Sequence, residues 1–266
     1  STLNPPGGFA SASRPFSFQD HFNPKSRPMI TSKDNDKLTL VRKLGQKKHR
    51  RKMGMFVTEG EDLALAGLEA GHEPIGLLVH PDSEVPGEKC DPELLDGVAT
   101  LASGTRVIGI WSDIWAEPQL LSADKCIFLD GVSDPGNVGT IIRTADALVG
   151  GYVVIGPGSA DPFSAIAVRS SMGSVFTQPL VRAEITATPE PRIALALGGS
   201  EGPGPVSGPA TLCLGSEREG LSEAVLKECG TTWTIPQRAG GAQSLNVAAA
   251  AAIACERISS PAGPAE

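Results

Sequence analysis

The stretch FLDGVSDPGNVGTIIRTADAL, residues 128–148, decides how the rest of this chain is interpreted. It continues the apolar run Cys126–Leu129, which is typical of a buried strand. The turn after that run is rich in glycine and proline, and a helix is expected to begin near Asn137. One face of that helix is apolar, at Ile141, Ile142, Ala145 and Leu148. Such a strand, loop and helix start presents free backbone N–H groups and a positive helix end above the strand.

Two polar side chains stand near this expected helix start. Asn137 offers a donor and an acceptor, and Arg143 offers a fork of donors suited to phosphate. The glycines alone are weak evidence, because they spell neither GxGxxG nor a Walker loop. A nucleotide-binding oxidoreductase is a competing hypothesis, but it lacks that fingerprint and a ribose-binding acid.

The whole stretch is more specific than its glycines. It resembles the first signature of the SpoU/TrmH family of RNA ribose 2′-O-methyltransferases. LGSEREGLS (residues 214–222) resembles the second signature, and IPQRAGGAQSLNVAAAAAIACE (residues 235–256) resembles the third. The three occur in the family's order and cover about half of the chain, from Ile127 to Ile258.

The resemblance implies an α/β fold of the SPOUT class: a trefoil-knotted methyltransferase domain preceded by a small α/β RNA-binding domain. In that fold the last helix threads through a loop, an exception to the rule against threading. Relatives are homodimers with the active site at the subunit interface. The implied cofactor is S-adenosylmethionine, and the implied cofactor-binding residues are Leu197, Gly198, Leu214, Gly215, Ile235, Pro236, Ser244 and Leu245.

The implied catalytic residues are Asn137, Arg143, Glu217, Ser244 and Asn246. Because arginine stays protonated, we interpret Arg143 as a clamp on the target phosphate that also stabilises the developing alkoxide, rather than as a base. The two asparagines would orient Arg143 and the ribose, and Glu217 would anchor the loops. From the residues alone, Ser244 is expected to cap the final helix, and Asn246 to satisfy loop carbonyls.

Composition limits the other possibilities. The chain has 266 residues and a net charge of −7. Its five cysteines are scattered and odd in number, which favours a reducing cytoplasm over a disulfide framework. Its four histidines are also dispersed, so no metal site is expected.

The domain boundaries follow from composition and from alternating apolar segments. Residues 1–28 are expected to be a disordered leader and 261–266 a tail. Alternating strands and helices predict a small α/β domain over 29–116, with strands over 55–60, 74–81 and 105–110, and a second α/β domain over 125–260, with one of its strands over 176–181. A linker is expected over 117–124. The resemblance implies that the second of these domains is the knotted methyltransferase domain. Within the latter, residues 182–191 are too short and proline-bearing for a full helix.

The small domain carries a local excess of positive charge in a net acidic chain. No acid lies between Lys37 and Glu59. The simpler interpretation is a solvated helix end; the functional one, which we favour, is contact with RNA phosphates. The candidate RNA-binding residues are Arg42, Lys43, Lys47, Lys48, Arg50, Arg51 and Lys52.

The sequence therefore predicts methyl transfer from S-adenosylmethionine to a ribose 2′-hydroxyl of structured RNA, with 23S-type ribosomal RNA as the favoured substrate. The alternatives are a tRNA ribose methyltransferase and a catalytically silent RNA-binding protein of the same fold.

Overall fold

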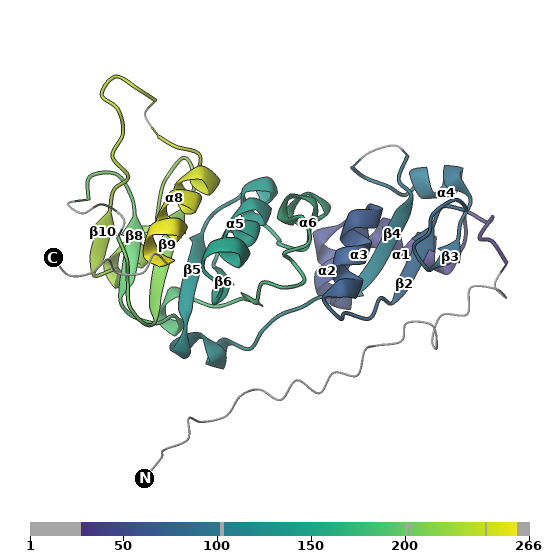
Figure 1. Cartoon of the computed structure of the whole chain (residues 1–266), viewed down its shortest axis with the longest axis horizontal. Coiled ribbons are helices and arrows are strands. Elements are labelled where there is room, and N and C mark those ends of the chain that lie inside the picture. Colours follow the sequence, from purple (N-terminus) through teal and green to yellow (C-terminus); the bar gives the residue numbers. More distant parts are fainter. Residues whose placement is uncertain (1–27, 102–103, 200–201, 203, 243, 260–266) are drawn as a thin grey trace, which may run out of the picture.

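The computed structural model describes residues 28–259 except 102–103, 200–201, 203 and 243, and these residues form two β-sheets (Figure 1). The sheets lie side by side along the long axis of the molecule; α6 lies between them, and α5 lies over the β5–β6 part of the large sheet. The predicted leader, apart from Pro28, and the predicted tail lie outside the described residues.

The smaller sheet has the strand order β1-β4-β2-β3. Strand β4 (Val107–Ser112) pairs antiparallel with β1 (Met55–Glu59) and β2 (Gly76–Val79), while β3 (Glu88–Lys89) runs parallel to β2. The sequence predicted the three longer strands but not β3, since two residues carry no periodic signal. Four helices accompany this sheet: α1 (Asp36–Leu44), α2 (Lys47–Met53), α3 (Glu61–Glu69) and α4 (Pro92–Asp96).

The larger sheet is parallel throughout, with the order β10-β8-β9-β5-β6-β7. Its central strand β5 (Lys125–Asp130) is buried, as its unbroken apolar run predicted. The other strands are β6 (Tyr152–Ile155), β7 (Leu180–Val181), β8 (Arg192–Leu195), β9 (Ala210–Gly215) and β10 (Thr231–Trp233). The predicted α/β fold class is thus confirmed as a parallel sheet.

The helices of this part are α5 (Pro135–Leu148), α6 (Ala165–Ser171), α7 (Glu223–Glu228) and α8 (Val247–Ser259), with 3₁₀ turns η2 (Pro118–Ala123) and η3 (Ile185–Ala187). Helix α5 begins two residues before Asn137, because Asp134 caps it by accepting a hydrogen bond from the Asn137 N–H at 2.8 Å and Pro135 occupies its first turn. A strand predicted over 176–181 shrinks to β7, since residues 173–177 form turns after α6.

The two sheets share one apolar cluster. The ring of Phe56 on β1 lies 4.9 Å from that of Phe163 and 5.7 Å from that of Phe176, both from the segments flanking α6. Trp111 on β4 meets Phe176 edge-on at 4.9 Å. Gly67 on α3 allows this approach, because any Cβ there would press on the Trp111 and Phe176 rings. The small sheet is therefore docked on the α6 side of the large one.

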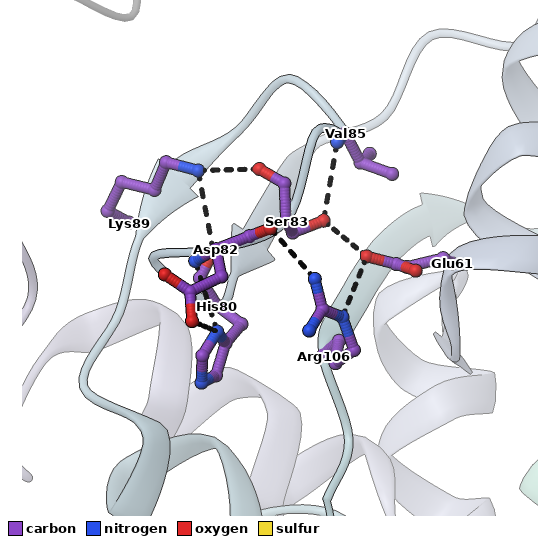
Figure 2. A network of polar contacts seen from close by, with 7 residues as sticks. All are labelled: Glu61, His80, Asp82, Ser83, Val85, Lys89 and Arg106. Atoms are coloured by element: carbon purple, nitrogen blue, oxygen red, sulfur yellow. Dashed lines mark hydrogen bonds and ion pairs between the residues drawn. The ribbon is translucent and has the colours of Figure 1, made fainter.

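A polar network holds the turn after β2 in the small sheet (Figure 2). Ser83 Oγ donates to Glu61 Oε1 at 2.6 Å, and Arg106 Nε donates to the same oxygen at 3.1 Å. Lys89 Nζ donates to the Ser83 carbonyl at 2.8 Å. The Ser83 hydrogen bond, and after it the one from Arg106, lowers the pKa of Glu61 below its ordinary 4.5.

Candidate active site

Three of the predicted catalytic residues meet where loops leave the large sheet. Asn137 lies in the first turn of α5, Glu217 in the turn after β9, and Asn246 just before α8. Asn137 Nδ2 donates to Glu217 Oε1. Asn246 Nδ2 donates to Asn137 Oδ1 at 3.1 Å and to Glu217 Oε1 at 3.2 Å. One residue from each sequence signature thus joins a single hydrogen-bonded cluster, which we call the Asn–Glu–Asn cluster.

The backbone around Glu217 explains its placement. Ser216 and Gly220 exchange backbone hydrogen bonds at 3.0 and 2.9 Å, which closes a tight turn around residues 217–219. Gly215 must lack a side chain, because a Cβ there would clash with the backbone of Gly220 and Leu221. Glu217 accepts from two other elements at once, the geometry of an anchor between loops.

Helix α8 starts differently from the prediction. Asn246, not Ser244, caps it: Asn246 Oδ1 accepts from the N–H groups of Ala248 at 2.9 Å and Ala249 at 3.2 Å. Serine and asparagine are both good caps. A cap at Ser244 would have started the helix at residue 245, whereas α8 begins at Val247. The same side chain therefore caps α8 with its oxygen and joins the cluster with its nitrogen.

Arg143 stands apart from this cluster. It lies six residues beyond Asn137, roughly 9 Å along the α5 axis and about 120° around it. Its side chain is exposed, and no hydrogen bond or ion pair joins it to another described residue. Within one chain, Asn137 and Asn246 therefore do not contact Arg143, and they do not orient it as predicted.

A cavity of about 570 Å³ adjoins the Asn–Glu–Asn cluster, and we call it the β9 cavity. It is lined by the ends of β8 and β9, the turn with Glu217, and the start of α8. The predicted cofactor residues in its wall are Leu197, Leu214, Gly215, Ile235, Ser244 and Leu245. Gly198 and Pro236 are not in the wall, although each adjoins a residue that is.

The sequence interpretation missed other lining residues, among them Leu226, Val247 and Ala250. Val247 and Ala250 follow the cap within the first turn of α8. A correct prediction of where α8 begins would therefore have placed both residues at the cavity. The volume lies within the roughly 300–1,000 Å³ typical of small-molecule sites. Exposed Leu197 and Leu245 make an apolar rim beside strand-end backbone groups, and these walls fit the adenine and sulfonium parts of S-adenosylmethionine.

The basic residues lie on α1 and α2, and all but one are exposed. The exception, Arg50, corrects a prediction. It is 8% exposed, and its guanidinium pairs with Asp161 through Nη2 at 2.8 Å and Nε at 2.9 Å. It also donates to the Leu44 carbonyl at 2.8 Å. Buried and paired in this way, Arg50 is not available to an RNA phosphate.

Among the residues that the structure describes, no group of three or more His, Cys, Asp or Glu side chains is placed to hold a metal ion. None of the helices built from those residues is long and apolar enough to cross a bilayer.

Comparisons with known proteins agree with this geometry. A model of the SpoU rRNA Methylase family matches residues 124–256. The Bacillus subtilis (strain 168) protein named 23S rRNA (guanosine(2553)-2'-O)-methyltransferase RlmP is 32% identical over 241 residues, which cover 84% of this chain and 96% of that one. An AdoMet-bound rRNA methyltransferase from Sinorhizobium meliloti superposes with a TM-score of 0.74 at 31% identity, over 86% of this chain and 95% of that one. AviRb, a SpoU methyltransferase from Streptomyces viridochromogenes solved with the cofactor AdoMet, superposes with a TM-score of 0.72 at 25% identity, over 83% and 96%.

The parallel sheet and the β9 cavity thus define the class, an α/β methyltransferase that uses S-adenosylmethionine. The chain belongs to the SpoU rRNA methylase family. The resemblance of the three signatures to this family is confirmed. Membership of a methyltransferase family excludes the hypothesis of a nucleotide-binding oxidoreductase.

Proposed function

We propose that this chain transfers a methyl group from S-adenosylmethionine to a ribose 2′-hydroxyl in ribosomal RNA of the 23S type. The observation that carries the proposal is the Asn–Glu–Asn cluster at the edge of the β9 cavity. It joins the three signatures in one place. The family match and the printed function of the Bacillus subtilis relative support ribosomal RNA as the substrate class.

The cofactor lies in the β9 cavity against the ends of β8, β9 and β10. Backbone groups of Leu197, Leu214, Gly215, Ile235 and Leu245, with Ser244, read and hold it, and Leu226 and Val247 add apolar wall. Gly198 and Pro236 adjoin these residues and shape the loops that carry them. When bound, S-adenosylmethionine supplies an electrophilic methyl group on a sulfonium, which departs as a neutral thioether. The chain therefore has to position the ribose and assist the loss of its proton.

Arg143 clamps the phosphate beside the target ribose and stabilises the alkoxide as it develops. Asn137 presents an amide beside the cavity to the ribose, and Glu217 holds Asn137 and Asn246 in register. Because Arg143 lies about 120° around α5 from Asn137 and makes no bond to the cluster of its own chain, we assign it to the site of a second copy. The functional unit is a homodimer, and Arg143 of the partner subunit completes each site.

The exposed stripe of α5 supports this dimer. Thr140, Arg143 and Ala147 follow one another at helical spacing on the solvent side, and Leu148 beside them is 43% exposed. On the neighbouring helix α8, Ile253 is 41% exposed. A second copy placed over these helices would cover the apolar groups and bring Arg143 to the partner's cavity.

The division of labour follows the two sheets. Residues 29–116 bind RNA through the exposed cations of α1 and α2, residues 117–124 connect, and residues 125–260 carry the reaction. The predicted trefoil knot belongs to the same proposal. It is supported by the insertion of β9 between β8 and β5 and by the packing of α8 against α5.

The test is methyl transfer by the purified protein, with labelled S-adenosylmethionine and separate 23S rRNA, 16S rRNA and total tRNA, followed by mapping of 2′-O-methyl groups. We expect label in one ribose of 23S rRNA. Label in tRNA alone would establish the tRNA alternative. RNA binding with no label in any RNA, despite cofactor binding by calorimetry, would establish the silent RNA-binding protein.

A further inference from the structure

A second cavity, of about 580 Å³, lies where the two sheets meet. Its wall combines Lys47 and Arg51 of α2, the end of β6 with the loop that follows it (residues 155–162), and residues 182–184 after β7. We call it the junction cavity. It shares no lining residue with the β9 cavity, so it is a separate site.

Positive charge dominates this wall. Lys47 and Arg51 are exposed, stand four residues apart on one face of α2, and form no ion pair with a described residue. Arg182 is exposed and lies over the Trp115 ring, 4.3 Å from its centroid. That contact holds the guanidinium at the cavity while leaving its N–H groups free to donate.

The acids in the wall do not cancel these cations. Asp161 is neutralised by the buried Arg50, and its other oxygen accepts from the Phe163 N–H at 3.1 Å. Glu184 is exposed, and it is the only other acid lining the cavity among the described residues. The wall therefore holds three cations that have no acidic partner and one carboxylate, that of Glu184, that is not neutralised by Arg50.

Arg50 gives the cavity its shape. It bonds Asp161 of the β6–α6 loop on one side and, on the other, the carbonyls of Leu44, which ends α1, and of Gly45, which follows it. This buried link fixes α2 against the large sheet, so that Lys47 and Arg51 line the same cavity as Arg182. Arg50 is a positioning residue, because it is not in the cavity wall, and Lys47, Arg51 and Arg182 are the residues that would contact the ligand.

We propose that the junction cavity binds the sugar–phosphate backbone of the RNA substrate, gripping it with cations from both sheets at once. The inference rests on the proposed function and extends it to a specific site. A cavity this wide exceeds the needs of a lone phosphate, whereas ribose and phosphate units fill it. Because one cation comes from the large sheet, the grip also sets the position of the RNA relative to the methyl-transfer site.

The experiment measures RNA affinity against salt for the full-length protein, with a 23S rRNA fragment and a twelve-residue oligouridylate as probes. We expect Arg182→Ala to flatten the slope of log K against log salt by about 0.7–0.9, and Lys47→Ala/Arg51→Ala by roughly 1.4–1.8. Arg182→Lys, which keeps the charge, should retain the slope. Lys33→Ala/Lys227→Ala removes two exposed charges outside both cavities and should leave the slope near that of the wild type.

A double-mutant cycle localises the effect. Arg182→Ala and Lys47→Ala/Arg51→Ala should be non-additive in RNA affinity, because both act on the same bound backbone. The matched pair Lys48→Ala/Lys52→Ala, on the same helix but outside the cavity wall, should be additive with Arg182→Ala. Cofactor affinity by calorimetry should be unchanged in every variant, which also confirms folding.

The outcomes separate this site from the proposed function. If the wild type methylates rRNA but Arg182→Ala binds with an unchanged slope, the junction site is wrong and the function stands. If no RNA is methylated but the oligouridylate shows the expected variant pattern, the function is wrong and the site stands. If inorganic phosphate competes as well as the oligouridylate at equal phosphate concentration, the site is one for free anions, and the assignment to RNA is wrong.

Discussion

Asn246 makes two different contributions from one side chain. Its oxygen caps α8, and its nitrogen bonds Asn137 and Glu217. A substitution that keeps the oxygen but removes the donor therefore separates helix stability from the geometry of the cluster.

We expect Asn246→Ala to lower the free energy of unfolding by about 1–2 kcal/mol, because both the cap and the cluster bonds are lost. Asn246→Asp keeps a capping oxygen but places a second carboxylate against Glu217. The Asp variant should therefore be less stable than the wild type at pH 8 and recover as the pH falls toward 5, when one carboxylate of the pair takes up a proton. Urea unfolding at both pH values measures this, and a pH-independent deficit would contradict the like-charge contact.

Arg143 is expected to act in the reaction and not in cofactor binding, since it does not line the β9 cavity. Arg143→Ala should reduce the rate constant for methyl transfer by ~10²–10³ and leave the dissociation constant for S-adenosylmethionine nearly unchanged. Single-turnover kinetics and calorimetry measure the two quantities. Thr140→Ala, one turn away on the same exposed face, is the control and should keep both. A wild-type rate in the Arg143 variant would remove Arg143 from the mechanism.

The sequence predicted which residues gather, but not how they are bonded. Asn137, Glu217 and Asn246 came from the order of the signatures, and they do meet. Arg50 was misassigned because its partner Asp161 lies 111 positions further along, beyond the reach of any local pattern. The cap was misplaced because Ser244 and Asn246 are both good caps, and only the true first turn of α8 distinguishes them.

At the scale of elements, the turn after β2 depends on one carboxylate. Glu61 on α3 accepts from Ser83 in the turn and from Arg106, which precedes β4 (Figure 2). Its folded pKa is lowered, so its contribution to stability is complete above the unfolded pKa near 4.5 and is lost as pH falls through the lower folded value.

Glu61→Gln should therefore be less stable than the wild type at pH 7, and the difference should shrink as the pH falls below about 4.5. Amide exchange of Val85, whose N–H donates to Ser83 Oγ at 3.3 Å, should accelerate in the variant at pH 7. Glu69→Gln, at an exposed position on the same helix, is the control. Equal stability of the Glu61 variant and the wild type at pH 7 would show that the network does not hold the turn.

Elements were predicted best where periodicity was long. The β5 strand and α5 appeared nearly as expected, because a buried run and a full apolar face leave little ambiguity. The strand expected over 176–181 failed, because Phe176 packs against Phe56 and Trp111 of the other sheet rather than within a strand. Phe176 is apolar because it packs between the two sheets, and no local sequence pattern specifies such a long-range contact.

At the scale of the whole molecule, the proposed homodimer makes a testable claim about where each site is built. Ser244→Trp should fill the β9 cavity and abolish cofactor binding, whereas Arg143→Ala should leave that cavity intact. If Arg143 serves the partner's cavity, a mixed dimer has one site with both defects and one with neither. Mixing and reassembling the two inactive variants should therefore restore about a quarter of wild-type activity, since half of the dimers are mixed.

Size-exclusion chromatography with light scattering should give twice the chain mass for each variant. No recovery on mixing, despite demonstrated subunit exchange, would show that every site is built within one chain. A monomeric, fully active protein would contradict the dimer itself.

The position of β9 in the chain decides how long one edge of β5 stays unpaired during synthesis, and so how long the nascent chain can aggregate through that edge. Strand β5 pairs with β6 on one side but with β9 on the other, and β9 begins at Ala210, 85 positions after Lys125. At ~5–20 residues per second, synthesis leaves that inner edge of β5 open for about 4–17 s. The exposed edge belongs to the apolar run Cys126–Leu129, the kind of surface that other chains pair with. Nascent chains stopped before Ala210 should thus depend on chaperones, and those completed through Gly215 should not.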